Sequence, residues 1–209
     1  MAIALEGTPS VIVDGGSYTA ETTGSDRLVV FSCAGHIGGD VLFTCADMGA
    51  QAATEGKLPA AGRKAPTGLY YIKEADIPTG TQTITLSVSA GSLDDSQITC
   101  YTLSGVDQTT PIKATGQDNG SPQATNAIGS TATDAGGYAI TGGGYYVGNA
   151  TFNTDPADSE GFTVYAEAEV TNGPKGSFAQ LTDGTAVTAT YVRSEERRGG
   201  KECRSRGSP

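Results

Sequence analysis

The sequence predicts an all-β protein, folded as an antiparallel β-sandwich of the jelly-roll type. Glycine (30 of 209 residues) and threonine (28) are abundant, whereas leucine is scarce (9) and tryptophan is absent. Short apolar or alternating segments recur between Gly, Pro and Asp turn signals, a pattern typical of sandwiches and barrels. Charged residues make up only 17% of the chain, which argues against helical bundles and coiled coils. No apolar run approaches the ~18 residues of a membrane-spanning helix.

The first half of the chain contains seven expected strands. A hairpin is expected at Asp14-Gly15-Gly16, because such turn residues between short alternating segments favour tight connections. The near-continuous apolar run of residues 27–33 predicts a central strand that is buried on both faces. Residues 46–66, rich in Ala, Gly and Pro, predict a long loop with room for one helical turn. The expected strands are residues 10–13, 17–20, 27–33, 40–45, 69–73, 82–90 and 97–106.

The second half repeats this organisation. In residues 162–170 apolar and polar positions alternate most regularly, so Glu167 and Glu169 share the expected solvent face. No linker or charge run divides residues 1–192, and the sequence therefore predicts a single sandwich domain over this range. The expected strands are residues 126–133, 138–141, 145–152, 162–170, 176–181 and 185–192.

Residues 193–209 differ from the rest of the chain. Nine of these 17 residues are charged, against 27 of the 192 before them, and the segment holds no large apolar residue. The composition predicts a disordered tail, and the segment resembles the translation of a sequencing-library adaptor. We therefore interpret it as an artefact and leave it out of functional reasoning. Residues 1–192 then carry 7 Lys+Arg and 20 Asp+Glu, a net charge of -13.

The middle of the chain carries a family resemblance. Residues 69–81 hold a Tyr-rich strand followed by Ala-Asp-Ile-Pro-Thr-Gly, and residues 101–112 read Tyr-Thr-Leu-Ser-Gly-Val-Asp-Gln-Thr-Thr-Pro-Ile. These segments resemble a widespread, mostly uncharacterised β-sandwich domain of tailed-phage structural proteins and bacterial surface proteins. The resemblance covers most of residues 17–192 in strand order and residues 69–112 in specific motif. It implies a sandwich fold and a virion setting, and it supplies no catalytic residue.

The same motif has a physical interpretation that is independent of the family. Pro78 fixes its own φ and Gly80 supplies a positive φ in a loop that leads into the next strand. Asp107 follows a buried strand, and its carboxylate is expected to accept backbone N–H bonds in an Asx turn where the chain crosses between sheets. We expect structural rather than ligand-binding roles for the motif residues, which are Ser104, Gly105, Val106, Asp107, Gln108 and Pro111.

Few residues suit catalysis or metal binding. His36 is the single histidine, so a Ser-His-Asp or Cys-His system would have to use it, and its glycine neighbours predict a loop position. Zinc needs about four ligands, whereas Cys33, Cys45 and His36 supply three and no Cys-x-x-Cys pair occurs. We therefore expect no catalytic, cofactor-binding or metal residues. The three cysteines of residues 1–192 are expected to be free thiols, with a Cys33–Cys45 disulfide as the alternative.

Two acidic groups could offer oxygen ligands to calcium. One is Asp155, Asp158 and Glu160, and the other is Asp94 and Asp95. Neither has the spacing of an EF-hand, so solvated carboxylates in turns are the favoured interpretation.

Residues 142–148, in which three glycines precede Tyr145 and Tyr146, are a candidate segment for surface recognition. Flexible backbone beside paired aromatic rings could present them to a sugar or a protein. Packing of these tyrosines within a strand is the alternative.

These observations favour a phage virion structural protein, tail-associated, fibre or capsid-decorating, that acts by assembly and surface recognition rather than catalysis. Its expected partners are other virion proteins or copies of itself and a host-surface glycan. The acidic charge argues against nucleic acid, no membrane partner is expected, and residues 1–6 lack the basic start of a signal peptide. The alternatives are a glycan-binding module or adhesin, extracellular or on a bacterial surface, and an enzyme such as a polysaccharide depolymerase. The enzyme would need a concave pocket with carboxylates of raised pKa.

Overall fold

An all-β architecture is present in the computed structural model. The structure describes residues 3–37, 39–58, 66–112 and 115, together with the strands that lie between residues 125 and 193. Within these residues the chain forms strands β1 to β15 and one 3₁₀ turn, η1 (Glu74–Asp76). Every strand pair is antiparallel. The predicted all-β antiparallel sandwich is therefore confirmed.

The two sheets formed by residues 4–104 have the strand order of a jelly roll. Their orders are β1-β9-β3-β7-β6 and β2-β8-β4-β5. If the short edge strand β6 is set aside, the other eight strands, counted along the chain, have the orders 1-8-3-6 and 2-7-4-5, the two interleaved Greek keys of a jelly roll. The bounds are β1 Ala4–Val13, β2 Gly16–Thr19, β3 Leu28–His36, β4 Phe43–Met48, β5 Gln51–Ala52, β6 Thr54–Lys57, β7 Thr67–Lys73, β8 Thr81–Val88 and β9 Asp95–Ser104.

The hairpin predicted at Asp14-Gly15-Gly16 is wrong, because β1 pairs with β9 and β2 pairs with β8. Asp14 and Gly15 have φ angles of 51° and 90°, and the turn carries the chain from one sheet to the other. The Asp14 N–H donates to the Ser96 carbonyl (2.9 Å), and the Ser96 N–H donates to Asp14 Oδ1 (2.8 Å). The turn residues were correct, but they do not say whether the flanking strands pair with each other.

The loop predicted for residues 46–66 is also wrong over its first half. Strand β4 continues to Met48, a tight turn follows at Gly49 (φ 64°), and β5 pairs back onto β4. Strand β6 then pairs with β7. Its sequence, Thr-Glu-Gly-Lys, has low intrinsic strand preference, so the pairing with β7 decides its conformation. Residues 59–65 lie outside the described residues.

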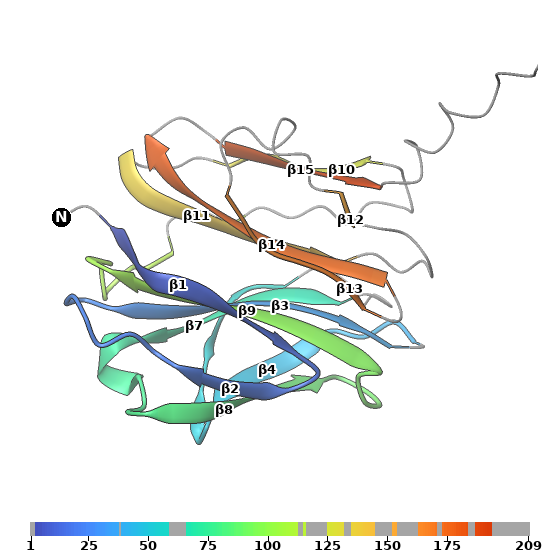
Figure 1. Cartoon of the computed structure of the whole chain (residues 1–209), viewed down its shortest axis with the longest axis horizontal. Coiled ribbons are helices and arrows are strands. Elements are labelled where there is room, and N and C mark those ends of the chain that lie inside the picture. Colours follow the sequence, from blue (N-terminus) through green and yellow to red (C-terminus); the bar gives the residue numbers. More distant parts are fainter. Residues whose placement is uncertain are drawn as a thin grey trace, which may run out of the picture.

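Strands from residues 125–193 form two further sheets, of order β11-β14-β13 and β10-β15-β12. Figure 1 shows the four sheets in layers, with the β11-β14-β13 sheet against the outer face of the five-stranded sheet. The ladder of β13 with β14 has a register shift between Val164 and Ala166, so the regular alternation predicted there is interrupted. The bounds are β10 Thr125–Thr131, β11 Ala135–Gly144, β12 Phe152–Asn153, β13 Thr163–Val170, β14 Gly173–Asp183 and β15 Val187–Arg193.

These bounds agree with the predicted strands near residues 126–133, 138–141, 162–170, 176–181 and 185–192. Residues 145–151 and 194–209 lie outside the described residues. The single domain over residues 1–192 stays a prediction.

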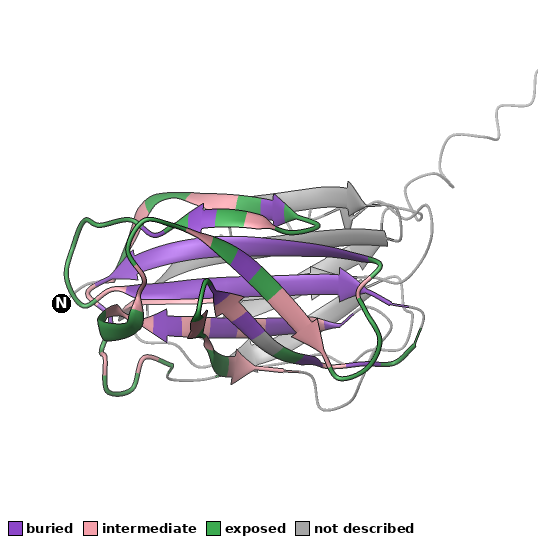
Figure 2. Ribbon diagram, turned by 90° about the horizontal axis from the view of Figure 1, so that it is seen from below, coloured by how far each residue is buried: buried purple, intermediate pink, exposed green. Residues whose placement is uncertain are grey.

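The five-stranded sheet is buried on both faces, as predicted for residues 27–33. Along β3, Val29 and Phe31 face the core between the two jelly-roll sheets, whereas Leu28 and Val30 face the opposite way. That second, outer cluster also receives Tyr138 and Ile140 of β11. Every residue of β3 and β9 is buried, and Figure 2 shows these central strands in purple. Surfaces open to a partner are therefore found at the edges and ends of this sheet rather than on its faces.

Candidate functional site

The motif that begins at Ser104 lies where β9 ends and the chain leaves the five-stranded sheet. Gly105 has a φ of 70°, a conformation that glycine adopts without strain. Its N–H donates to the Ser25 carbonyl (2.8 Å), and the Val106 N–H donates to the Asp26 carbonyl (2.9 Å). The Val106 side chain is buried in the outer cluster. The backbone of the motif is thus tied to the segment that precedes β3.

Asp107 forms the Asx turn that the sequence predicts. Its Oδ1 accepts the Thr109 N–H and its Oδ2 accepts the Thr110 hydroxyl, both at 2.8 Å. These hydrogen bonds, led by the one from the Thr109 backbone, lower the pKa of the Asp107 carboxyl. The carboxylate is therefore ionised and its oxygens are engaged locally, two and three residues along the chain.

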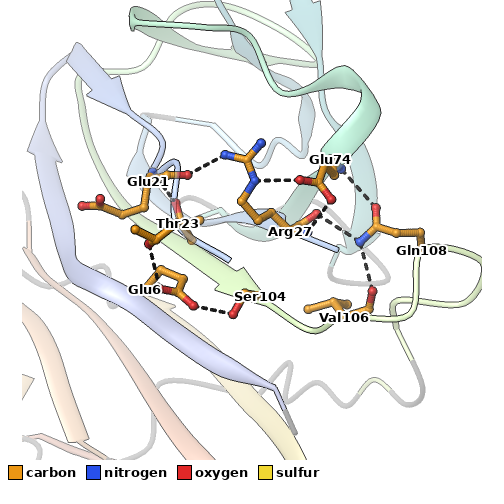
Figure 3. A network of polar contacts seen from close by, with 9 residues as sticks. Glu6, Glu21, Thr23, Arg27, Glu74, Ser104, Val106 and Gln108 are labelled. Carbon is orange, nitrogen blue, oxygen red and sulfur yellow. Dashed lines mark hydrogen bonds and ion pairs between the residues drawn. The ribbon is translucent and has the colours of Figure 1, made fainter. Parts of the chain in front are cut away.

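Gln108 joins three segments that are distant in sequence. Its Nε2 donates to the carbonyls of Arg27 (3.1 Å) and Val106 (3.0 Å), while its Oε1 accepts the N–H of Glu74 (3.0 Å). One side chain thus connects the start of β3, the loop after β9 and the start of η1 (Figure 3).

An ion pair continues this network. Arg27 Nε donates to Glu74 Oε1 (2.9 Å), and the Arg27 backbone N–H donates to Glu74 Oε2 (3.2 Å). Arg27 Nη1 also donates to the carbonyl of Glu21 (2.8 Å). The hydrogen bond from Arg27 is the main cause of the lowered pKa of Glu74. The pair holds η1 against the start of β3.

Glu6 of β1 closes the other side of the network. Its carboxylate accepts hydrogen bonds from the hydroxyls of Ser104 and Thr23, the latter at 2.8 Å, and these bonds lower its pKa. Figure 3 shows the two halves of the network beside each other. We call this set the polar latch; its residues are Glu6, Thr23, Arg27, Glu74, Ser104 and Gln108.

The chemistry of the latch is that of a structural clamp. The carboxyls of the latch residues Glu6 and Glu74, and that of Asp107 beside the latch, all have a lowered pKa, so they are acceptors at neutral pH and poor proton donors. Sequence reasoning selected Ser104 and Gln108 but missed the other four residues of the latch, which are Glu6, Thr23, Arg27 and Glu74. Glu74 lies within the motif segment 69–81, which was the available signal for it.

His36 is not a loop residue, which corrects the prediction. It is the last residue of β3, opposite Asp95 of β9, and 7% of it is exposed. Its Nδ1 lies 3.2 Å from Asp94 Oδ2. Next to it, Gly35 leaves room for Leu93, because a Cβ on Gly35 would lie 2.8 Å from Leu93 Cδ2. Asp95 itself lies in β9 and is buried, so it is not the solvated turn residue that the sequence predicts.

The cysteines follow the favoured prediction where they are described. Cys33 and Cys100 are free and buried, so the alternative Cys33–Cys45 disulfide is wrong. Burial raises the pKa of both thiols, that of Cys100 to about 12, which makes both poor nucleophiles. Across the described residues, no group of three or more His, Cys, Asp or Glu side chains could hold a metal ion.

The remaining candidate residues from the sequence lie in parts of the chain that the structure does not describe. Tyr145, Tyr146 and the acidic group Asp155, Asp158 and Glu160 all lie outside the described residues. Among the described residues, no helix is long and apolar enough to span a membrane. Comparison of the chain with protein-family models, with curated proteins and with solved structures finds no match.

Proposed function

We propose that this chain is a structural component of a phage virion, tail-associated, fibre or capsid-decorating, that acts by assembly and surface recognition. The observation that carries the proposal is the jelly-roll strand order of residues 4–104, a fold that builds viral capsid proteins. The family resemblance of residues 69–112 supports the same setting.

The polar latch is consistent with this role. Its side chains bind one another and nearby backbone groups, so they serve to hold the sandwich together. The excess of acidic residues favours protein partners over nucleic acid, because phosphate backbones attract basic proteins.

The proposal is tested by mass spectrometry of virions purified on a density gradient from the source material. Trypsin cleaves after Lys73 and Lys113, so the peptide of residues 74–113 would report the motif segment. We expect this peptide to co-purify with the known capsid and tail proteins at a constant ratio. Its absence from intact virions would overturn the proposal.

A glycan-binding module or adhesin is the second candidate, since jelly rolls also form lectin domains. Tyr145 and Tyr146 are the residues predicted to recognise a sugar. A glycan array should then give a sugar-dependent signal that Tyr145→Ala or Tyr146→Ala abolishes. A signal unaffected by both changes, or no signal, argues against this candidate.

A further inference from the structure

Strand β1 forms one edge of the five-stranded sheet, next to β9. Its ladder with β9 is interrupted by a register shift between Glu6 and Ser10, which leaves residues 10–13 as a separate stretch. At the other end of β1, the Ile3 N–H donates to the Gly136 carbonyl of β11 (3.1 Å). Among the described residues, no strand pairs with the outward side of residues 10–13, Ser-Val-Ile-Val, which we call the open edge.

The register shows which backbone groups of the open edge point outward. The Asp14 N–H donates to the Ser96 carbonyl, so Asp14 and Ser96 form a hydrogen-bonded pair. Hydrogen-bonded and non-hydrogen-bonded pairs alternate along an antiparallel ladder. Ile12 and Ile98 therefore form a pair joined by backbone hydrogen bonds, whereas Val11 and Val13 direct their N–H and carbonyl groups away from β9.

The side chains of the open edge are suited to contact with another protein chain. Val11 and Val13 are each 42% exposed, and they are among the few exposed large hydrophobic residues that the described part of the chain contains. The open edge has no charged residue. The opposite edge strand of the same sheet, β6, carries Glu55 and Lys57, and charges of this kind protect an edge from pairing.

We propose that the open edge pairs with the open edge of a second copy of this chain, in an antiparallel two-fold arrangement. The inference rests on the proposed function, because it names a contact through which copies would assemble. Two-fold antiparallel pairing is self-complementary, and it would join two five-stranded sheets into one continuous sheet. The Val11 and Val13 N–H and carbonyl groups would then gain partners.

The register that pairs the outward-directed groups of Val11 with those of Val13 is centred on Ile12. With Ile12 opposite its own copy on the two-fold axis, Val11 lies opposite Val13 of the second copy, and Asp14 lies opposite Ser10. This register places no carboxylate opposite another, and like charges in that position are destabilising. The contact is short, so we expect a weak dimer that is reinforced where many copies meet. Because each chain is strongly acidic, salt should strengthen the association by screening repulsion.

The test is sedimentation of the full chain over a wide range of concentration, at low and moderate salt. We expect a reversible dimer. Val11→Lys should lower its association constant about tenfold or more, since each new lysine meets an apolar partner at a desolvated contact. Thr54→Lys, an exposed position on β6, is the matched control and should leave the association unchanged.

A second variant tests the register. In Val11→Lys/Val13→Glu each new lysine lies opposite a new glutamate of the other copy, so association should return toward the wild-type value. A chain that is monomeric at every concentration overturns the inference. So does a dimer that responds equally to Val11→Lys and Thr54→Lys, or one that the double variant fails to restore.

The outcomes separate the inference from the proposed function. A monomeric chain that is present in virions would overturn the inference alone. A dimer with the expected response, formed by a chain absent from virions, would overturn the proposed function alone. Circular dichroism and thermal unfolding of each variant show whether it is folded before its association is compared.

Discussion

The polar latch and the open edge lie in the same jelly roll but have opposite properties. The latch has a motif that is visible in the sequence, and its side chains hydrogen-bond to other groups of the chain. The open edge has no motif, yet Val11 and Val13 direct their backbone groups away from β9 and have exposed side chains. A distinctive sequence motif can therefore mark a structural clamp, whereas a contact surface is recognisable only once the sheet order is known.

Removing the Gln108 side chain should have the largest effect on stability. Gln108→Ala deletes three hydrogen bonds, two of which join the loop after β9 to η1 and to the start of β3, at about 1 kcal/mol each. We expect the free energy of unfolding to fall by about 2–3 kcal/mol in chemical denaturation. The control, Gln51→Ala, removes one exposed hydrogen bond and should change stability by less than about 0.5 kcal/mol. Equal effects at the two positions would show that Gln108 is not a clamp.

Adding a methyl group to Gly105 should have the next largest effect. Gly105→Ala places a Cβ on a residue with a φ of 70°, where L-residues are strained by about 1–2 kcal/mol. Thermal unfolding should report a loss of that size. Gly39→Ala, in open space and without a positive φ, should be nearly neutral, and a neutral result at Gly105 would contradict the backbone account of the motif.

Acid should weaken the hydrogen bonds of the polar latch. It should not act on the open edge directly, because residues 10–13 have no titratable side chain. The pKa values of Glu6 and Glu74 are lowered from 4.5 and that of Asp107 from 3.8. A folded-state pKa below the unfolded value stabilises the protein above that unfolded value, and the contribution is lost as the pH falls through the folded pKa. Unfolding free energy should therefore decline below about pH 4.5. Glu74→Gln should reduce the size of this decline, and an unchanged slope would count against the ion pair.

Substitution at the open edge should have the smallest effect on the stability of the monomer. Val11 is exposed and directs its N–H outward, so Val11→Lys should shift the free energy of unfolding by less than about 0.5 kcal/mol in dilute solution. Chemical denaturation at low protein concentration checks this. A loss comparable to that of Gln108→Ala would mean that the open edge is held by the rest of the chain.

Local features were predictable from the sequence, and distant ones were not. The Asx turn of Asp107 depends on residues two and three positions away, and the burial of β3 follows from its own apolar run. The pairing of Arg27 with Glu74 spans 47 residues, and that of Gln108 with Arg27 spans 81. No local pattern encodes such contacts. The same reason explains the wrong hairpin at Asp14, since the partner of β1 is β9 at the far end of the jelly roll.

Amide hydrogen exchange, measured at low and high protein concentration, is the most direct test of the difference between the polar latch and the open edge. The amides of Glu74, Gly105 and Val106 donate to partners within the chain, so they should be protected at every concentration. The amides of Val11 and Val13 should exchange rapidly in dilute solution and become protected as the concentration rises. Protection of Val11 and Val13 in dilute solution would show that these amides already have partners within one chain, and rapid exchange at all concentrations would show that the open edge does not pair with a second copy.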